Sequence, residues 1–343
     1  MRYLLALLIA SSLWGQALWI RSVPDQVWKA PEAGRGYEGW ALDLAVGPSA
    51  LSALKPAALE IILMAKGKVV ERTRLERAAL QALARPRYRL AADAPSTALQ
   101  RAFHLDEAFD VRLRFSRPQA WAVDAMSLRL EVADGKRVQV RRLTLPLASY
   151  TPRTAFIFPF TGPAILTQGP ITDGGHGGYA NQHALDALAL SPDYAPQVND
   201  RDENDSYAGW GHAVLAMADG IVVHARNDVP DNPKPGETLE RVWASLPDPV
   251  RAVAGNCVVI AHGHGECTAL MHLKQGSVTV KVGDQVKQGQ VVGQLGSSGD
   301  SFGPHLHLQL MAGPALFKDP SLPLVFSNLP QFRPLRGVYF CPK

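Results

Sequence analysis

The sequence predicts an all-β protein built from two successive β domains. Short segments that alternate apolar and polar side chains recur along the chain, and this period of two is typical of strands that bury one face. Glycine and proline separate these segments, as expected where a chain turns. A length of 343 residues suffices for two domains, and a hydrophobic content of 47% is typical of globular proteins.

The N-terminus has the features of a secretory signal. A positive Arg2 precedes the apolar run Leu4–Ala10, and small residues follow as far as Ala17. We predict cleavage near Ala17, so residues 1–17 form a signal peptide and the protein is exported, either to the periplasm or out of the cell. The alternative is an uncleaved N-terminal membrane anchor, because residues 18–20 extend the apolar stretch to about the length that spans a bilayer.

Residues 22–150 are predicted to form a β-sandwich-like accessory domain. Four segments alternate with a period of two: Trp40–Val46, Ala58–Leu63, Phe109–Phe115 and Ser127–Val132. Their spacing is typical of an immunoglobulin-like sandwich. The stretch Glu71–Leu83 has the composition of a helix. Because this part of the sequence contains no cluster of histidines, cysteines or carboxylates, we expect it to position the rest of the chain or to bind a partner.

A further β domain is predicted over residues 151–330, after a proline-containing connector at Pro146–Phe160. Glycine is frequent here, and Val278–Gly293 has two glycine-centred turns between β-branched runs, which predicts a core of short strands. Two insertions interrupt this core. The first, Ser191–Gly211, is polar and acidic, and the second contains a predicted short helix at Glu237–Leu246.

The charge and the cysteine content of the sequence argue against two classes of function, nucleic-acid binding and a zinc site with cysteine ligands. The net charge is +4 and no block of like charges occurs, so nucleic-acid binding is not indicated. A weak attraction to an anionic surface such as a cell wall or membrane is allowed. The sequence contains three cysteines, Cys257, Cys267 and Cys341, so at least one thiol stays unpaired. A Cys-x-x-Cys motif is absent, which argues against a structural zinc site with cysteine ligands. We predict no particular disulfide and no obligate protein partner.

Three separated segments each offer groups that could bind a metal or move a proton: Gly174–Asp186, Asn256–Leu273 and Gly299–Leu310. The last contains His305-Leu306-His307 and continues with the alternation of a strand. Side chains two apart in a strand share a face, so both imidazoles would face one cleft, about 6–7 Å apart along the backbone. One of them could bind a metal while the other stays free for acid–base work.

These residue types suit metal-assisted amide hydrolysis. Two histidines and one aspartate, with a water in the fourth position, make a catalytic zinc site. Such an ion lowers the pKa of its bound water to about 7 and polarises a carbonyl. Histidines outside the ligand set could accept the proton of that water and stabilise the oxyanion. The sequence therefore contains a complete set of residues for this chemistry.

The same segments carry a family resemblance. Met271-His272-Leu273, Val282–Gln290, Gly296–Gly299 and Gly303–His307 follow one another in the order found in the lysostaphin/LytM-type zinc endopeptidases of cell-wall peptidoglycan, which this stretch resembles. The similarity covers roughly Phe160 to Leu310. It implies a LytM-type antiparallel β core with short helices in its insertions. It also implies an exported zinc metalloendopeptidase that hydrolyses peptide bonds of peptidoglycan by a zinc-activated water.

The resemblance also implies roles for single residues. Asp186 and His307 would be zinc ligands, and His272 and His305 would be the catalytic pair beside the metal-bound water. Many family members have a histidine four residues before the aspartate, where this chain has Gln182.

Two histidines remain as candidates for the first zinc ligand. His183 lies three residues before Asp186, which puts it on the opposite face of a straight strand. Other family members place this ligand further upstream in a His-x-Gly context, which matches His176-Gly177-Gly178. We therefore favour His176 over His183 as the first ligand, together with Asp186 and His307.

Two further functions stay open from the sequence. The family includes catalytically silent members, so the chain could be a LytM-fold regulator that binds a partner hydrolase or the wall. It could also be a metal-dependent amidase that acts on a different exported substrate. Zinc content separates the first alternative from the enzyme hypothesis, because silent members have usually lost ligands.

Overall fold

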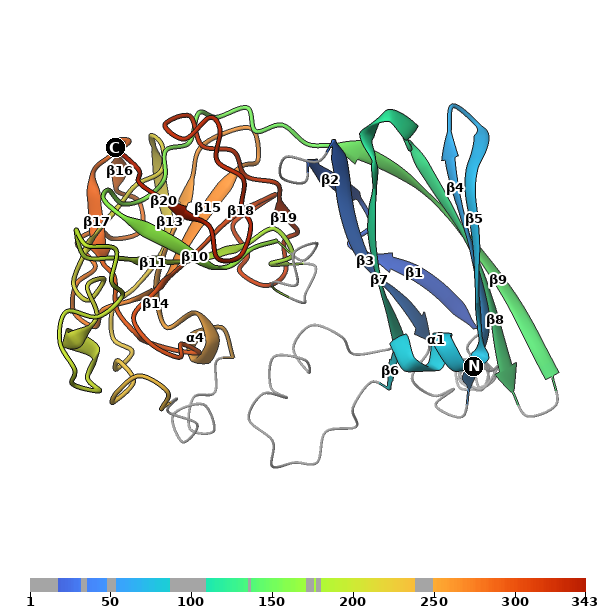
Figure 1. The fold of residues 1–343 in the computed structure, drawn as a ribbon, viewed down its shortest axis with the longest axis horizontal. Coiled ribbons are helices and arrows are strands. Elements are labelled where there is room, and N and C mark those ends of the chain that lie inside the picture. Colours follow the sequence, from blue (N-terminus) through green and yellow to red (C-terminus); the bar gives the residue numbers. More distant parts are fainter. Residues whose placement is uncertain are drawn as a thin grey trace, which may run out of the picture.

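The computed structural model describes residues 18–31, 36–47, 54–86, 109–134, 137–170, 176, 180–237 and 249–343. The predicted signal peptide and nearly all of the predicted helix at 237–246 lie outside these ranges. Two nine-stranded sheets, each with its own apolar core, account for most of the described chain and confirm the all-β prediction (Figure 1). Within the described ranges, no helix has the length and apolar character needed to cross a membrane.

The first sheet is formed by the N-terminal part of the chain. Its strands are β1 (Trp19–Val23), β2 (Val27–Pro31), β3 (Tyr37–Gly47), β4 (Lys55–Ala65), β5 (Lys68–Glu76), β6 (Ala84–Pro86), β7 (Phe109–Pro118), β8 (Ala125–Asp134) and β9 (Arg137–Ser149). The order is β5-β4-β8-β9-β2-β3-β7-β6, and β1 pairs with β3. Helix α1 (Arg77–Leu83) joins β5 to β6, and a 3-10 turn at Gln119–Trp121 follows β7.

This sheet folds over into two layers, as the sandwich-like prediction requires. Strands β4, β5, β8 and β9 form one layer, and β1, β2, β3 and β7 form the other (Figure 1). The layers are joined by β2 and β9, which pair in parallel, whereas the other pairs in this sheet are antiparallel. Large side chains from both layers fill the space between them, among them Trp40, Leu44, Leu59 and Leu128, which are fully buried.

All four predicted strands of this region lie within β3, β4, β7 and β8. The predicted helix at Glu71–Leu83 is wrong over its first half, because β5 continues to Glu76 and only the second half forms α1. Glutamate, arginine and leucine favour a helix over the second half of β5, but this strand pairs along β4, and Glu71, Arg72 and Arg74 form ion pairs with Arg117, Glu60 and Glu131. Tertiary pairing thus outweighs local propensity here.

The C-terminal sheet contains β10 (Ala164–Gln168), β11 (Leu185–Ala189), β13 (Gly220–Arg226), β14 (Asn256–Ala261), β15 (Cys267–Leu273), β16 (Gln285–Val286), β18 (Leu306–Met311), β19 (Ser321–Leu322) and β20 (Tyr339–Phe340). Its order is β16-β13-β14-β15-β18-β11-β10-β20, with β19 beside β18. Strands β12 (Ala213–Leu215) and β17 (Val291–Gln294) form a separate pair, and the short helix α4 (Pro249–Ala254) precedes β14. A 3-10 turn at Asn204–Ser206 lies in the polar insertion.

The two faces of this sheet pack against different clusters. Leu306 and Leu308 of β18 point into the main core, whereas Met311 belongs to a smaller cluster that includes Met271 and Ala254. Strand alternation therefore places His307, which lies between Leu306 and Leu308, on the face of the smaller cluster. That face carries the polar residues described below.

The connector between the sheets is held by one buried carboxylate. Glu266, which is 1% exposed, accepts hydrogen bonds from the hydroxyl of Tyr150 and from the backbone amides of Arg153 and Thr154. The ring of Tyr150 also packs edge-on against Trp28. The free connector is shorter than predicted, because β9 extends to Ser149. The domain limits 22–150 and 151–330 stay predictions.

Candidate metal centre

Three side chains converge on the polar face of the C-terminal sheet. Oδ1 of Asp186 lies 2.9 Å from Nδ1 of His307 and 3.2 Å from Nε2 of His176. These three atoms all lie within 4.8 Å of one another. The carboxylate and His307 are about 95% buried, and the His176 side chain is 14% exposed.

The pairing of the strands sets this geometry. Asp186 of β11 lies directly opposite His307 of β18, so both side chains project from the same face at the same level of the sheet. On the other side of β18, His307 lies opposite Met271. His272 follows with φ of +62°, so the regular alternation of β15 breaks there and its ring packs against His305 with 4.7 Å between ring centroids.

Hydrogen bonds fix which nitrogen of each ring faces the centre. Nδ1 of His272 donates to the carbonyl of Ser298 at 2.9 Å, and Nδ1 of His305 donates to the carbonyl of Gly303 at 2.9 Å. In both rings Nε2 is thereby left as the nitrogen with a free lone pair. Nε2 of His305 lies 3.8 Å from Oδ1 of Asp186.

The third ring is held in the opposite tautomer. Nε2 of His307 donates to Oε1 of Gln309 at 3.1 Å, so its Nδ1 lone pair points toward Asp186. Gln309 is fully buried and lies two residues further along β18, on the same face. An amide oxygen behind a metal-binding imidazole fixes both its tautomer and its orientation.

Electrostatics favour an ionised carboxylate at Asp186 and shift the pKa values of His272 and His307 in opposite directions. Burial raises the pKa of Asp186, but the charges of His176 and His305 and its contacts with His176 and His307 outweigh burial and hold this pKa well below its usual value. Burial, together with His305 and His307, lowers the pKa of His272 well below its usual value. Burial also lowers the pKa of His307, but the contact with Asp186 outweighs it and raises this pKa.

The donor set fits a zinc ion. Two imidazole nitrogens and one carboxylate oxygen are the ligands of catalytic zinc sites, and ligand atoms about 2 Å from such an ion lie roughly 3.3 Å apart. The separations of 2.9 and 3.2 Å are close to that figure. In addition, Nε2 of His176 and Oδ1 of Asp186 are buried without a hydrogen-bond partner, as expected of atoms that share a cation.

The structure separates the two candidates for the first ligand. His176 lies beside Asp186, and its ring centroid is 4.7 Å from that of His307. His183 is buried elsewhere, and its backbone amide donates to Ser321. Burial lowers the pKa of His183 to about 3, so its ring is neutral at physiological pH. The structure thus brings His176, Asp186, His307, His272 and His305 together and leaves His183 apart.

Sequence reasoning missed the groups that orient these rings. Gln309 could have been found, since it stands two residues after His307 in an alternating strand. The carbonyls of Ser298 and Gly303 could not, because they belong to a loop whose path no periodicity predicts. Ser301 also lies in this loop, and its hydroxyl is 3.1 Å from Nδ1 of His305.

Comparison with known proteins shows a similarity to peptidases over part of the chain. Residues 205–316 match the model of peptidase family M23, a range that contains His272, His305 and His307 but not His176 or Asp186. The chain is 32% identical over 117 residues to the cell division protein DipM of Caulobacter vibrioides, covering 34% of this chain and 15% of DipM. It is 39% identical over 83 residues to the peptidoglycan DD-endopeptidase ShyC of Vibrio cholerae, covering 24% of this chain and 18% of ShyC.

The matched stretch thus spans less than one fifth of the length of either relative. Among solved structures, the catalytic domain of the prophage-encoded M23 protein EnpA from Enterococcus faecalis is similar to this chain. The identity is 21%, the TM-score is 0.31, and the match covers 49% of this chain and 94% of that domain. The family match falls on the stretch that holds His272, His305 and His307. Residues 205–316 of this chain are therefore similar to peptidase family M23.

Proposed function

We propose that this protein is an exported zinc metalloendopeptidase that hydrolyses peptide amide bonds of cell-wall peptidoglycan. The observation that carries the proposal is the approach of Nε2 of His176 and Nδ1 of His307 to one carboxylate oxygen of Asp186, at 3.2 and 2.9 Å. The substrate class is supported by relatives such as ShyC, whose name describes a peptidoglycan DD-endopeptidase. Export is supported by the signal-like N-terminus.

His176, Asp186 and His307 are proposed to hold the ion. When bound there, zinc would polarise the scissile carbonyl and make a water molecule acidic at neutral pH. Asp186 enters as an ionised carboxylate and releases no proton when the metal binds, whereas His307, whose pKa is raised by Asp186, would give up a proton to bind through Nδ1. Gln309 keeps the Nδ1 lone pair of His307 directed at the site.

His272 and His305 are proposed to handle protons and developing charge. Each ring is anchored through Nδ1 to a backbone carbonyl, so each presents Nε2 to the space beside Asp186. The low pKa of His272 leaves that nitrogen free to accept a proton from the attacking water. His305, at the exposed end of the pair, could then donate a hydrogen bond to the oxyanion or a proton to the leaving amine.

Zinc stoichiometry on the purified mature protein is the first test. We expect about one zinc per chain in the parent protein and in the His183→Ala variant, and almost none in His176→Ala. Digestion of purified peptidoglycan, followed by mass analysis of the released peptides, then tests the activity. If the parent protein takes up no zinc after reconstitution, the enzyme proposal fails and a wall-binding or regulatory role replaces it.

A second pair of variants separates ligand from catalyst. We expect His307→Ala to lose zinc and hydrolysis together, because a ligand is removed. We expect His305→Ala to keep zinc and lose hydrolysis by about 10²–10⁴-fold, the range usual for a general acid or base. Zinc loss in His305→Ala with retention in His307→Ala would contradict the roles proposed here.

A further inference from the structure

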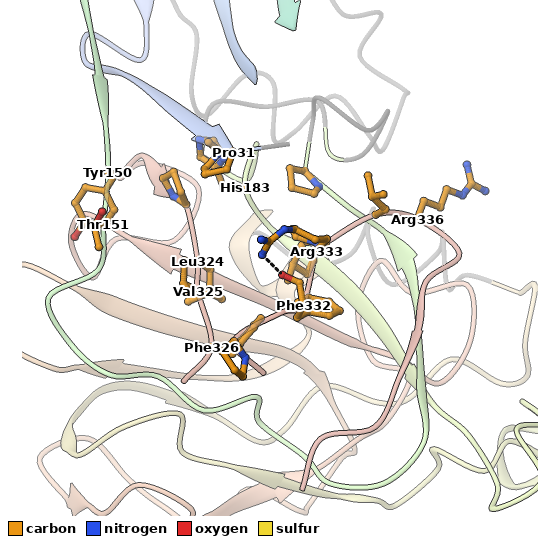
Figure 2. Close-up of a pocket in the computed structure, with 17 residues that line it drawn as sticks. Pro31, Tyr150, Thr151, His183, Leu324, Val325, Phe326, Phe332, Arg333 and Arg336 are labelled. Atoms are coloured by element: carbon orange, nitrogen blue, oxygen red, sulfur yellow. Dashed lines mark hydrogen bonds between the residues drawn. The ribbon is translucent and has the colours of Figure 1, made fainter. Parts of the chain in front are cut away.

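A cavity of about 450 Å³ lies away from the metal centre, where the two halves of the chain meet (Figure 2). It is lined by the end of β2, by the connector at Tyr150 and Thr151, by the start of β11 and by the segment after β19. This volume is typical of sites that bind small molecules. Leu185 lines the cavity and its neighbour Asp186 faces the metal centre, so the two sites lie on opposite faces of β11.

The lining is mostly apolar, with one buried polar group. Proline, leucine, valine and phenylalanine side chains dominate it, among them Leu324, Phe326 and Phe332. His183 also lines the cavity and is only 3% exposed, yet neither of its ring nitrogens has a hydrogen-bond partner. A buried imidazole without partners is costly, since each polar atom has lost water and gained nothing. Both nitrogens are closed to solvent, so a ligand with a carbonyl or amide group would supply the missing partner after a small shift of the ring toward the cavity.

Among the described residues that line the cavity, the charged ones are both positive. Arg333 and Arg336 belong to the segment after β19, and none of the described lining residues is an aspartate or a glutamate. Arg333 is exposed, and its side chain makes one described hydrogen bond, to the carbonyl of Phe332. Its guanidinium therefore has further donors for an anion, and a carboxylate matches the fork geometry of these donors. The hydroxyl of Tyr150 is occupied by Glu266, so Tyr150 offers the ligand only its ring.

We propose that this cavity binds a short apolar peptide by its free C-terminal end, with the terminal carboxylate on Arg333 and a backbone group on His183. The apolar walls would accept the side chains between these two points. A fatty acid would also match an arginine and apolar walls, but it would leave His183 without a partner. The site is separate from the proposed metal centre, and the proposal stands whether or not that centre is catalytic.

The binding experiment uses a blocked tripeptide, acetyl-alanyl-leucyl-phenylalanine, as the free acid and as the C-terminal amide. Titration calorimetry on the metal-free full-length protein measures binding without any contribution from hydrolysis. We expect the acid to bind at least tenfold more tightly than the amide, because only the acid pairs with the guanidinium. Dodecanoate serves as the competing ligand, and tighter binding of dodecanoate than of the peptide acid would overturn the proposal.

Three variants locate the binding. Arg333→Gln should remove the preference for the acid, and His183→Phe should weaken acid and amide alike by about tenfold, since a buried partner of the backbone is lost. Arg201→Gln is the matched control, because Arg201 is an exposed arginine that does not line the cavity. It should bind both peptides like the parent protein.

Equal binding of acid and amide by the parent protein, or a preference for the acid that survives in Arg333→Gln, would overturn the proposal. Circular dichroism of each variant shows whether it has folded.

Discussion

At the scale of single residues, the amide behind His307 determines how well the centre can hold a metal. Gln309 is fully buried, and its Oε1 receives the Nε2 proton of His307 at 3.1 Å. Without this acceptor the ring could rotate or change tautomer, and Nδ1 would no longer point steadily toward Asp186. We therefore expect Gln309 to contribute to metal affinity rather than to any bond-making step.

We expect Gln309→Leu to weaken zinc binding by about 10–100-fold, the range usual when such a partner is lost. Competition with a chromophoric chelator measures this affinity without reference to activity. Gln309→Glu, which keeps an acceptor at the same position, should bind zinc at least as tightly as the parent protein. Equal affinity in the parent and in Gln309→Leu would show that the neighbouring residues alone orient His307.

The alternation of β18 made part of this site predictable. It placed the side chains of His305 and His307 on the same face. His183 lies an odd number of residues before Asp186, so in a straight strand its side chain would point to the opposite face. His176 was chosen from a resemblance, because a glycine-rich stretch has no periodicity that fixes where its side chains point. The left-handed conformation of His272, which turns its ring toward His305, has no sequence signal at all.

At the scale of elements, the loop between β17 and β18 is fitted closely against the end of β15. A Cβ added to Gly296 would lie 2.3 Å from the backbone of Lys274, a distance that real side chains do not reach. Gly296 follows Leu295, which forms a bridge with Leu273, the last residue of β15. This contact keeps the carbonyl of Ser298 beside His272.

We expect Gly296→Ala to lower the free energy of unfolding by at least about 2 kcal/mol, because the clash involves backbone atoms that cannot rotate away. Urea denaturation followed by fluorescence measures the loss. Gly209→Ala is the control, since its added Cβ would meet only ordinary contacts of 3.4 Å or more, and it should change stability little. Similar stabilities for the two variants would mean that the loop can shift at small cost.

The strands were predictable as elements, but their partners were not. Period-two alternation located β3, β4, β7 and β8 correctly, since each of them directs its large apolar side chains to one face. The alternation of β5 was masked by a composition of arginine and glutamate, which favours a helix when no neighbouring strand is considered. The parallel pairing of β2 with β9 joins residues that are far apart in the chain, and no local signal encodes it.

At the scale of the whole molecule, Glu266 joins the connector to the C-terminal sheet. Burial raises the pKa of this carboxyl, but hydrogen bonds from Thr154, Tyr150 and Arg153 outweigh burial, so the net pKa is lowered. A carboxyl whose pKa is lower in the folded than in the unfolded protein stabilises the folded protein. This contribution is complete at pH values above the unfolded pKa of about 4.3, and it is lost as the pH falls through the lower pKa of the folded state.

We therefore expect Glu266→Ala to lower the melting temperature at pH 7 by several degrees, because two backbone amides lose a charged acceptor. The difference from the parent protein should be constant between pH 7 and 5 and should shrink below about pH 4. Calorimetric scans across this range measure it. Tyr150→Phe removes one of the three donors and should show a smaller difference, and a pH-independent difference would contradict the assignment.

The pairing of β11 with β18 also has a kinetic consequence. Asp186 and His307 become neighbours only when these two strands, which are distant in the chain, have come together. A partly folded chain would therefore lack a complete set of the proposed ligands, and we expect zinc to bind tightly only after β11 and β18 have paired. We expect saturating zinc to leave the refolding rate unchanged and to slow unfolding, as stopped-flow fluorescence in urea would show. A protein whose metal site forms late in folding would bind its metal as the last step. The bound metal would then make transient unfolding rarer, and with it cleavage by proteases.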